Sequence, residues 1–190
     1  MSSAARFPAS PLAELLAAGE DARLELVDGA LSGVETSGEH ADAQAGVLAC
    51  VRSSYHRTGG GDRGPGGWWI YVEPTVQLTL REVYRPDLAG WRRERAPNRP
   101  TGFPIHLVPD WVCEVLSPGN APHDLVHKRR VYHAAKVDHY WLVDPMREEV
   151  TVMRWNLDGY LILDIAAVEG VLRAPPFPEA ALELASLFGK

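Results

Sequence analysis

One apolar segment that contains a carboxylate, residues 107–116 (LVPDWVCEVL), limits most strongly how this chain can fold. Its length and its branched and aromatic side chains predict a central strand, which the Ser-Pro-Gly sequence at 117–119 ends. Alternation along a strand places Val112, Glu114 and Leu116 on one face. A buried ionised carboxylate is costly unless it is paired or bound to a metal. We therefore expect Glu114 at a sheet edge, in a salt bridge or, as the functional alternative, in a metal site at the end of the strand.

The rest of the sequence alternates between helical and extended patterns. Ser10 and Pro11 are typical of a helix start, and Asp28-Gly29 is typical of a hairpin turn. Helices are expected at residues 11–18, 40–57, 123–136 and 179–187, and strands at 23–27, 30–34, 68–72, 75–80, 86–91, 139–143, 149–154 and 160–165. This order predicts an α/β or α+β domain with a mixed sheet and an N-terminal hairpin.

Length and composition indicate one ordinary globular domain. A chain of 190 residues, 46% hydrophobic and 23% charged, can form a single core, so we expect one domain over residues 1–190. No apolar run approaches the roughly 18 residues of a membrane span, and the first ten residues lack the apolar core of a secretory signal. Cys50 and Cys113 lie far apart, which favours buried thiols in a reducing compartment. We therefore expect a cytoplasmic protein with no membrane partner.

The distribution of basic charge is more informative than its sum. A net charge of −6 argues against a protein that coats nucleic acid through bulk electrostatics, but it permits contact over a small patch. Of the 19 basic residues, 16 are arginines, and six of these lie within residues 81–99. Lys128, Arg129 and Arg130 form a second cluster. Charge runs of this kind are also typical of solvated surface.

Two other carboxylates follow prolines near predicted strands. Asp87 comes after Pro86 at the start of one strand, and Asp110 comes after Pro109. Pro-Asp pairs are common in turns, so the dipeptide alone does not identify a site. We rank Asp87 above Asp110 as a candidate site residue.

One face of the helix expected at 123–136 carries three polar residues. Asp124, Lys128 and Tyr132 are spaced four residues apart and lie along this face. An ion pair on a solvated helix explains the spacing, but lysine is scarce in this chain. Unlike arginine, lysine can lose its proton, and its compact charge can stabilise an attacking hydroxide. Lys128 is therefore a candidate catalytic residue.

Other motifs suggest different chemistry. His123 and His127 have the spacing of helical zinc ligands, but the sequence around them contains no HExxH pattern. The glycine-rich stretch 58–67 predicts either a plain connector or a flap over a site. The sequence contains no Walker loop, dinucleotide-binding fingerprint or GxSxG elbow.

Several of these segments, taken in order, form a specific combination. They are ELVDG (25–29), RPDL (85–88), CEVLSP (113–118), Asp124, Lys128-Arg129, Tyr132, YWLVDP (140–145) and LFG (187–189). Together they resemble the Uma-two family of restriction-endonuclease-like proteins, in the PD-(D/E)XK nuclease superfamily. The resemblance extends over residues 10–188. It implies a restriction-endonuclease-like mixed β-sheet flanked by helices.

The resemblance also implies a metal-dependent active site that hydrolyses DNA phosphodiester bonds. Asp87 and Glu114, with a backbone carbonyl of the 114–115 region, would hold Mg²⁺ or Mn²⁺ through oxygen ligands. Lys128 would orient the water or stabilise the transition state. One departure is that Leu116 stands where the superfamily places a lysine. The assignment of Lys128 therefore requires its helix to pack beside the end of the strand.

The same resemblance suggests supporting residues. Asp124 and Tyr132 would position Lys128, and His40, at the start of the first long helix, could face the same cleft. The arginine-rich segment 81–99 would contact the phosphate backbone.

The implied partners are nucleic acid, with DNA as the expected substrate, and a second copy of the chain. The sequence does not decide between DNA and RNA. Analogy with the fold suggests a homodimer that buries an exposed pair, Trp68-Trp69. Two alternatives stay open at this stage. One is a catalytically inactive nuclease fold that serves as a binding or regulatory module. The other is a different hydrolase or zinc protein that uses His123 and His127.

Overall fold

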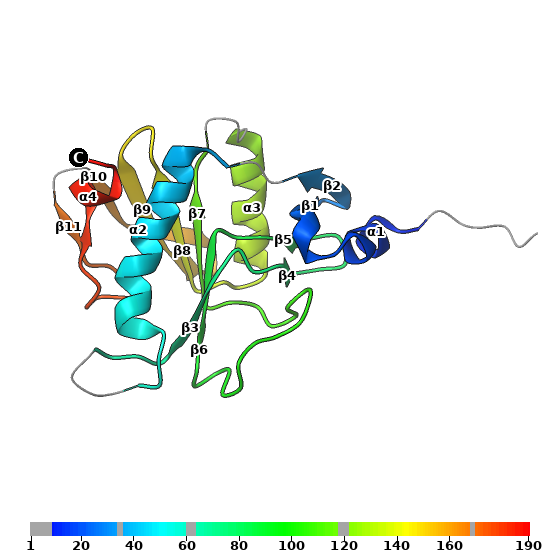
Figure 1. The fold of residues 1–190 in the computed structure, drawn as a ribbon, viewed down its shortest axis with the longest axis horizontal. Helices are drawn as coiled ribbons and strands as arrows, with labels where there is room; N and C mark the ends of the chain where they lie inside the picture. Colours follow the sequence, from blue (N-terminus) through cyan, green and yellow to red (C-terminus); the bar gives the residue numbers. More distant parts are fainter. Residues whose placement is uncertain (1–8, 34–35, 60–63, 118–121, 168–169) are drawn as a thin grey trace, which may run out of the picture.

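Six strands form the central sheet of the structure (Figure 1). In spatial order they are β10 (Gly159–Ala167), β9 (Glu149–Asn156), β8 (His139–Asp144), β7 (Trp111–Val115), β6 (Leu88–Arg92) and β3 (Trp68–Val72). β7 and β8 pair in parallel, and the other neighbours pair antiparallel. The sheet is therefore mixed and the strand that carries Glu114 is central, as predicted. The alternative that Glu114 lies at a sheet edge is wrong, because β7 is paired on both sides.

The computed structural model describes residues 9–33, 36–59, 64–117, 122–167 and 170–190, without the side chains of residues 122–124. Part of the predicted glycine-rich connector or flap, residues 60–63, lies outside the described residues. So do the side chains of His123 and Asp124, although both residues belong to a helix.

A smaller sheet contains the predicted N-terminal hairpin and two short strands. In spatial order its strands are β2 (Ala30–Gly33), β1 (Leu24–Val27), β5 (Val83–Tyr84) and β4 (Val76–Gln77). The hairpin turns at Asp28 and Gly29, both at positive φ, a conformation that glycine adopts without steric cost. Leu26 pairs with Val83. This pairing fixes the hairpin beside the segment that leads into β6.

The helices largely match the predicted ranges. They are α1 (Pro11–Ala18), α2 (Gly38–Tyr55), α3 (Pro122–Ala134) and α4 (Leu184–Leu187), with a 3₁₀ turn η1 (Glu20–Ala22). Ser10 and Ser37 cap α1 and α2, because each hydroxyl oxygen accepts a hydrogen bond from a backbone N–H three residues later. In the described parts of the chain, no helix is both long enough and apolar enough to cross a membrane.

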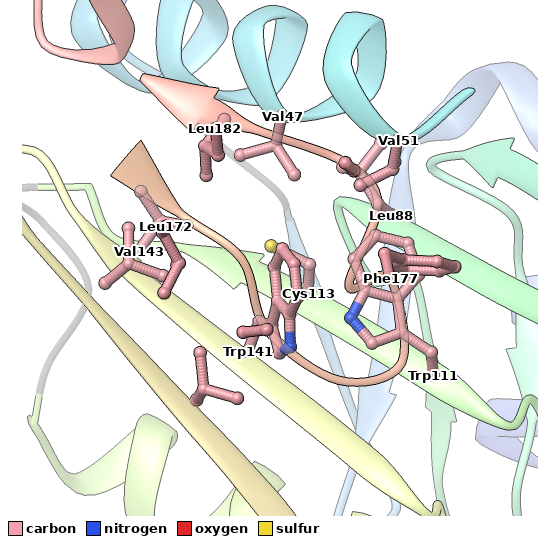
Figure 2. Close-up of a cluster of buried hydrophobic side chains, with 14 of the residues drawn as sticks. Val47, Val51, Leu88, Trp111, Cys113, Trp141, Val143, Leu172, Phe177 and Leu182 are labelled. Atoms are coloured by element: carbon pink, nitrogen blue, oxygen red, sulfur yellow. The ribbon is translucent and has the colours of Figure 1, made fainter. Parts of the chain in front are cut away.

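β7 separates two hydrophobic cores because its side chains alternate. Cys113 belongs to the larger core, on the side of α2, and packs there with residues such as Val47 (Figure 2). Val112 belongs to a second core, which includes Tyr132 of α3. Glu114 shares the face of Val112. The sheet therefore directs this carboxylate toward α3.

The C-terminal segment closes the larger core. It contains two short paired strands, β11 (Val171–Leu172) and β12 (Leu182–Glu183). Phe177, between these strands, is fully buried, and Figure 2 shows it close to Trp111 and Trp141. The ring centroid of Phe177 lies 4.8 Å from that of Trp111 and 5.8 Å from that of Trp141. One aromatic side chain thus ties the end of the chain to the central sheet.

Three predicted elements are shorter than expected. The strand predicted at 107–116 covers only residues 111–115. The helix predicted at 179–187 covers only residues 184–187, because Leu182 pairs with Leu172 in a strand instead. The strand predicted at 75–80 is limited to residues 76–77. Beyond it the backbone turns, since the N–H of Leu78 donates to the carbonyl of Glu82.

The prediction that Trp68 and Trp69 form an exposed pair is wrong. Trp68 is only 6% exposed, and its ring centroid lies 5.0 Å from that of Phe177 inside the larger core. Trp69 is half-buried, and its indole N–H donates to the carbonyl of Ala96 at 3.0 Å. This pair packs within its own chain, so it does not form the predicted dimer surface.

We expect Phe177→Ala to lower the free energy of unfolding by about 3–5 kcal/mol, because the substitution leaves a cavity among packed aromatic rings. Denaturant unfolding followed by tryptophan fluorescence measures this loss. Leu157→Ala is the control, since Leu157 is 78% exposed and its loss should change stability by less than about 0.5 kcal/mol. Equal stability of the two variants would contradict the role given to Phe177.

Candidate active site

Asp87 immediately precedes β6 and is hydrogen-bonded to residues of β7 and α2. Its Oδ2 accepts a hydrogen bond from the backbone N–H of Val115 at 2.6 Å. Its backbone carbonyl accepts one from Nε2 of Gln44 at 2.9 Å. Asp87 is buried. The hydrogen bond to Val115 places this carboxylate beside the residue that follows Glu114, at the end of β7.

His40 contacts Asp87 directly. It lies in the first turn of α2, where its Nε2 is 2.9 Å from Oδ1 of Asp87. Its Nδ1 is 3.0 Å from the hydroxyl of Ser117, just after β7. The imidazole therefore links Asp87 to the end of the central strand. The structure brings His40 to the cluster in which the sequence suggested it.

Glu114 projects from β7 toward α3. Its Oε1 accepts a hydrogen bond from the hydroxyl of Tyr132 at 2.6 Å and lies 3.8 Å from Nζ of Lys128. Burial raises the pKa of Glu114 to about 8. Lys128 and Tyr132 act against this rise, whereas the charges of Asp87 and Glu25 add to it. The site thus destabilises an ionised Glu114 in the absence of a further cation.

Lys128 lies between two carboxylates. Its Nζ is 2.9 Å from Oε2 of Glu25 and 3.8 Å from Oε1 of Glu114. Lys128 is buried, and its Nζ also lies 5.4 Å from the ring centroid of Tyr84. Its position shows that α3 packs beside the end of β7. Leu116 stands where the superfamily places a lysine, so the assignment of Lys128 required this packing of α3. The structure contains it.

Glu25 is a member of the cluster that the sequence reasoning missed. It lies on β1, is buried, and accepts a hydrogen bond from the backbone N–H of Arg85 at 2.7 Å. Together with its ion pair to Lys128, this bond joins the N-terminal hairpin to the central site. The signal that identified Glu114, a carboxylate inside an apolar strand, was also present here.

The donor set can be compared with the needs of a divalent cation. Among the described residues, no group of three or more His, Cys, Asp or Glu side chains is arranged to hold a metal ion. Mg²⁺, however, commonly takes one or two protein carboxylates and fills its other positions with water. Asp87 and Glu114 supply two carboxylates at one strand end, and burial raises the pKa of Glu114, so a bound cation would stabilise its ionised form. These residues fit a hydrated Mg²⁺ or Mn²⁺ ion.

Asp110, the competing carboxylate, has a structural role instead. Its Oδ1 lies 2.8 Å from Nε of Arg95, and its Oδ2 accepts a hydrogen bond from the backbone N–H of Arg92 at 2.8 Å. Asp110 precedes β7, so it lies at the opposite end of this strand from Val115. The lower rank given to Asp110 agrees with this position.

The alternative zinc pair has no support in the described residues. His127 lies 3.1 Å from Oε1 of Glu82, which also accepts a hydrogen bond from the hydroxyl of Tyr84 through Oε2. The side chain of His123 lies outside the described part of the chain, as does that of Asp124. The expected supporting role of Asp124 thus stays a prediction.

The arginines of segment 81–99 do not form a continuous free patch. Four of them are paired with carboxylates in the same chain: Arg81 with Asp28, Arg85 with Glu73, Arg92 with Asp138 and Arg95 with Asp110. Arg93 stacks over the ring of Trp69, with 3.5 Å between its Cζ and the ring centroid. Most of this charge is therefore paired within the chain, and the expected contact with a phosphate backbone is confined to fewer residues.

Comparisons with known proteins agree with this architecture. A crystal structure from Anabaena variabilis, described as a putative nuclease belonging to DUF820, matches with a TM-score of 0.75 and 18% sequence identity. The match covers 95% of this chain and 98% of that chain, and at this identity the likeness concerns the fold. A search of the curated proteins finds no match.

The family comparison extends over nearly the whole chain. The family model Uma2, described as "Putative restriction endonuclease", matches residues 10–185. This range contains Asp87, Glu114 and Lys128, and it confirms the resemblance drawn from the sequence motifs. The chain therefore belongs to the Uma2 family of restriction-endonuclease-like proteins.

Proposed function

We propose that this chain is a divalent-metal-dependent endonuclease that hydrolyses DNA phosphodiester bonds. The observation that carries the proposal is the convergence of Asp87, Glu114 and Lys128, from three separate elements, at the end of β7. Two buried carboxylates beside one buried cation can hold a metal and still present a positive charge to a phosphate. We extend the proposal to residues 1–190 as one domain and to a cytoplasmic location.

In this mechanism Asp87 and Glu114, with a backbone carbonyl of the 114–115 region, hold Mg²⁺ or Mn²⁺. The bound ion supplies a water of lowered pKa and offsets the charge of the phosphate. His40 fixes the orientation of the Asp87 carboxylate through the contact at 2.9 Å. Tyr132 does the same for Glu114 by donating its hydroxyl hydrogen bond to Oε1.

Lys128 supplies the fixed positive charge in this mechanism. Its Nζ stabilises negative charge that develops on the phosphate oxygens or orients the attacking water. Glu25 holds the ammonium group in place at 2.9 Å. A charge that is already oriented needs no reorganisation during the reaction, which is the main advantage of a buried lysine here.

The second candidate function is a catalytically inactive nuclease fold that binds nucleic acid or regulates a partner. The contact between Lys128 and Glu25 favours this candidate, because it offsets part of the lysine charge. Absence of a three-ligand group among the described residues favours it as well. Metal binding without turnover of DNA or RNA would identify this function.

The first test is cleavage of supercoiled plasmid DNA with Mg²⁺ or Mn²⁺. We expect Asp87→Asn and Glu114→Gln each to lower the cleavage rate about a hundredfold or more, because metal ligation supplies several kcal/mol of transition-state stabilisation. Titration calorimetry should show weaker Mn²⁺ binding by both variants. Glu14→Gln, at an exposed position on α1, is the matched control. Cleavage by either site variant at the wild-type rate would refute the assignment.

Metal affinity should depend on pH through Glu114. Because the pKa of this group is raised to about 8, the proton competes with the metal below that pH. We expect the Kd for Mn²⁺ to increase as pH is lowered from 8.5 to 6.5, by up to about tenfold per pH unit. Calorimetry at several pH values measures this slope. An equal Kd over the range, or an equal slope in Glu114→Gln, would contradict the role of Glu114.

We also propose a homodimer, with β10 as its surface in place of the tryptophan pair. β10 is an edge strand, and Leu161, Ile162, Leu163 and Ile165 on it are 41–55% exposed. An apolar edge strand offers unpaired backbone groups to another strand. Two antiparallel copies of β10 would satisfy these groups about a two-fold axis.

Sedimentation equilibrium tests this dimer. We expect wild-type protein to have about twice the chain mass of 20.9 kDa, and Leu163→Lys to sediment as a monomer because it places charge in the interface. Met146→Lys is the control, since Met146 is 69% exposed in the turn between β8 and β9. A monomeric wild-type protein would exclude the dimer.

A further inference from the structure

A cavity beside the edge strand β3 contains two arginines and a buried hydroxyl. Its volume is about 420 Å³, which is enough for one nucleotide. The lining residues used below are Arg52, Tyr71, Pro74, Thr75, Arg99 and Ile105. They come from α2, from β3 and the residues that follow it, and from the loop that follows β6, so the cavity brings together three separate parts of the chain.

The two arginines of this cavity differ from most arginines of segment 81–99. Within the described residues, neither Arg52 nor Arg99 has a carboxylate partner among the ion pairs. Arg52 donates through Nη1 to the carbonyl of Ile70 at 2.7 Å, and Arg99 donates through Nε to the hydroxyl of Tyr71 at 3.1 Å. Each bond uses one nitrogen and fixes the guanidinium, so the others stay available to an anion.

Thr75 supplies a second, independent observation. This residue is only 4% exposed, and its Oγ1 is buried without a hydrogen-bond partner among the described residues. A buried hydroxyl without a partner is costly and rare in native proteins. Thr75 also lines the cavity, so an oxygen atom of a bound ligand is a candidate acceptor for this hydroxyl.

The surroundings of the cavity are positively charged. The pKa of the nearby His56 is lowered, first by burial and then by the charges of Arg52, Arg93 and Arg99. Glu20 is the one acidic residue among those that line the cavity, and it is exposed. The two arginines exceed this single negative charge, so the cavity favours an anion.

We propose that this cavity binds one phosphate-bearing nucleotide unit of a nucleic-acid strand that extends from the active site. Arg52 and Arg99 contact the phosphate, and Thr75 donates its hydroxyl hydrogen bond to the same group. Tyr71, Pro74 and Ile105 form the wall beside the sugar and base. The identity of the ligand rests on the proposed nuclease function.

The position of the cavity agrees with a continuous strand. Pro74 and Thr75 follow Glu73, whose backbone N–H donates to the carbonyl of Asp87 at 3.0 Å. His40 and Arg52 lie on the same helix, 12 residues apart, which corresponds to about 18 Å along its axis. At about 3.4 Å of axial rise per nucleotide, this span equals roughly five nucleotides. The cavity is thus a subsite several nucleotides from the cleavage site.

The test measures binding without cleavage. A fluorescent single-stranded 12-mer is titrated into Glu114→Gln protein, alone and combined with Arg99→Ala, and anisotropy gives Kd at several salt concentrations. We expect Arg99→Ala to weaken binding about tenfold and to lower the slope of log K against log salt by about 0.7. Arg154→Ala is the matched control, because Arg154 is also exposed but lies on β9 opposite His139. It should change neither quantity.

Thr75→Val separates a ligand contact from a structural role. Valine keeps the shape of threonine and removes a hydroxyl without a partner, so we expect an equal or higher Tm. Binding of the 12-mer should nevertheless weaken severalfold. Wild-type affinity in either Arg99→Ala or Thr75→Val would overturn the subsite.

Two further measurements distinguish the possible ligands and functions. Arg99-dependent binding of the mononucleotide dAMP without binding of the 12-mer would overturn the assignment to a strand. Plasmid cleavage by the wild-type chain is measured in parallel. If the 12-mer binds in an Arg99-dependent way but plasmid is not cleaved, the nuclease function is refuted and the subsite is kept. If plasmid is cleaved and the Arg99→Ala and Arg154→Ala variants have equal cleavage rates, only the subsite is refuted.

Discussion

The buried ion pair between Lys128 and Glu25 connects the parts from which the site is built. It joins α3 to the N-terminal hairpin at 2.9 Å, and the same ammonium group lies 3.8 Å from Glu114 on the central strand. Removing one partner of a buried pair leaves an uncompensated charge, which is strongly destabilising. The positions of hairpin, helix and sheet are thus coupled through this lysine.

The electrostatics of the cluster follow from its composition. Asp87, Glu25 and Glu114 are buried carboxylates, and the buried Lys128 contacts two of them, Glu25 and Glu114. Burial and the neighbouring carboxylates raise the pKa of Glu114, so the protein alone does not stabilise the fully ionised cluster. A proton or a metal cation can supply the missing positive charge. The same property that makes Glu114 unfavourable as a buried anion therefore makes the site suitable for a cation.

Much of this arrangement could be predicted from local sequence. Alternation within residues 107–116 placed Glu114 on the correct face of the strand, and the turn and cap residues marked the hairpin and the first helix. The remaining features depend on contacts between distant residues. Burial of Trp68 requires Phe177, and the partner of Lys128 is Glu25, which is 103 residues away. The shortened last helix has the same cause, since the pairing of Leu182 with Leu172 competes with local helical periodicity.

The acidic net charge and the pairing of most arginines restrict how such a chain could hold nucleic acid. Four arginines of segment 81–99 are paired with carboxylates, so they add little to a general attraction for phosphate. The carboxylate cluster itself repels phosphate until a cation reaches it. On the proposed function, substrate binding and metal binding are therefore coupled at the active site, whereas Arg52 and Arg99 attract the strand independently of the metal. Because these two arginines do not depend on the metal, the strand can bind to them before the metal binds at the active site.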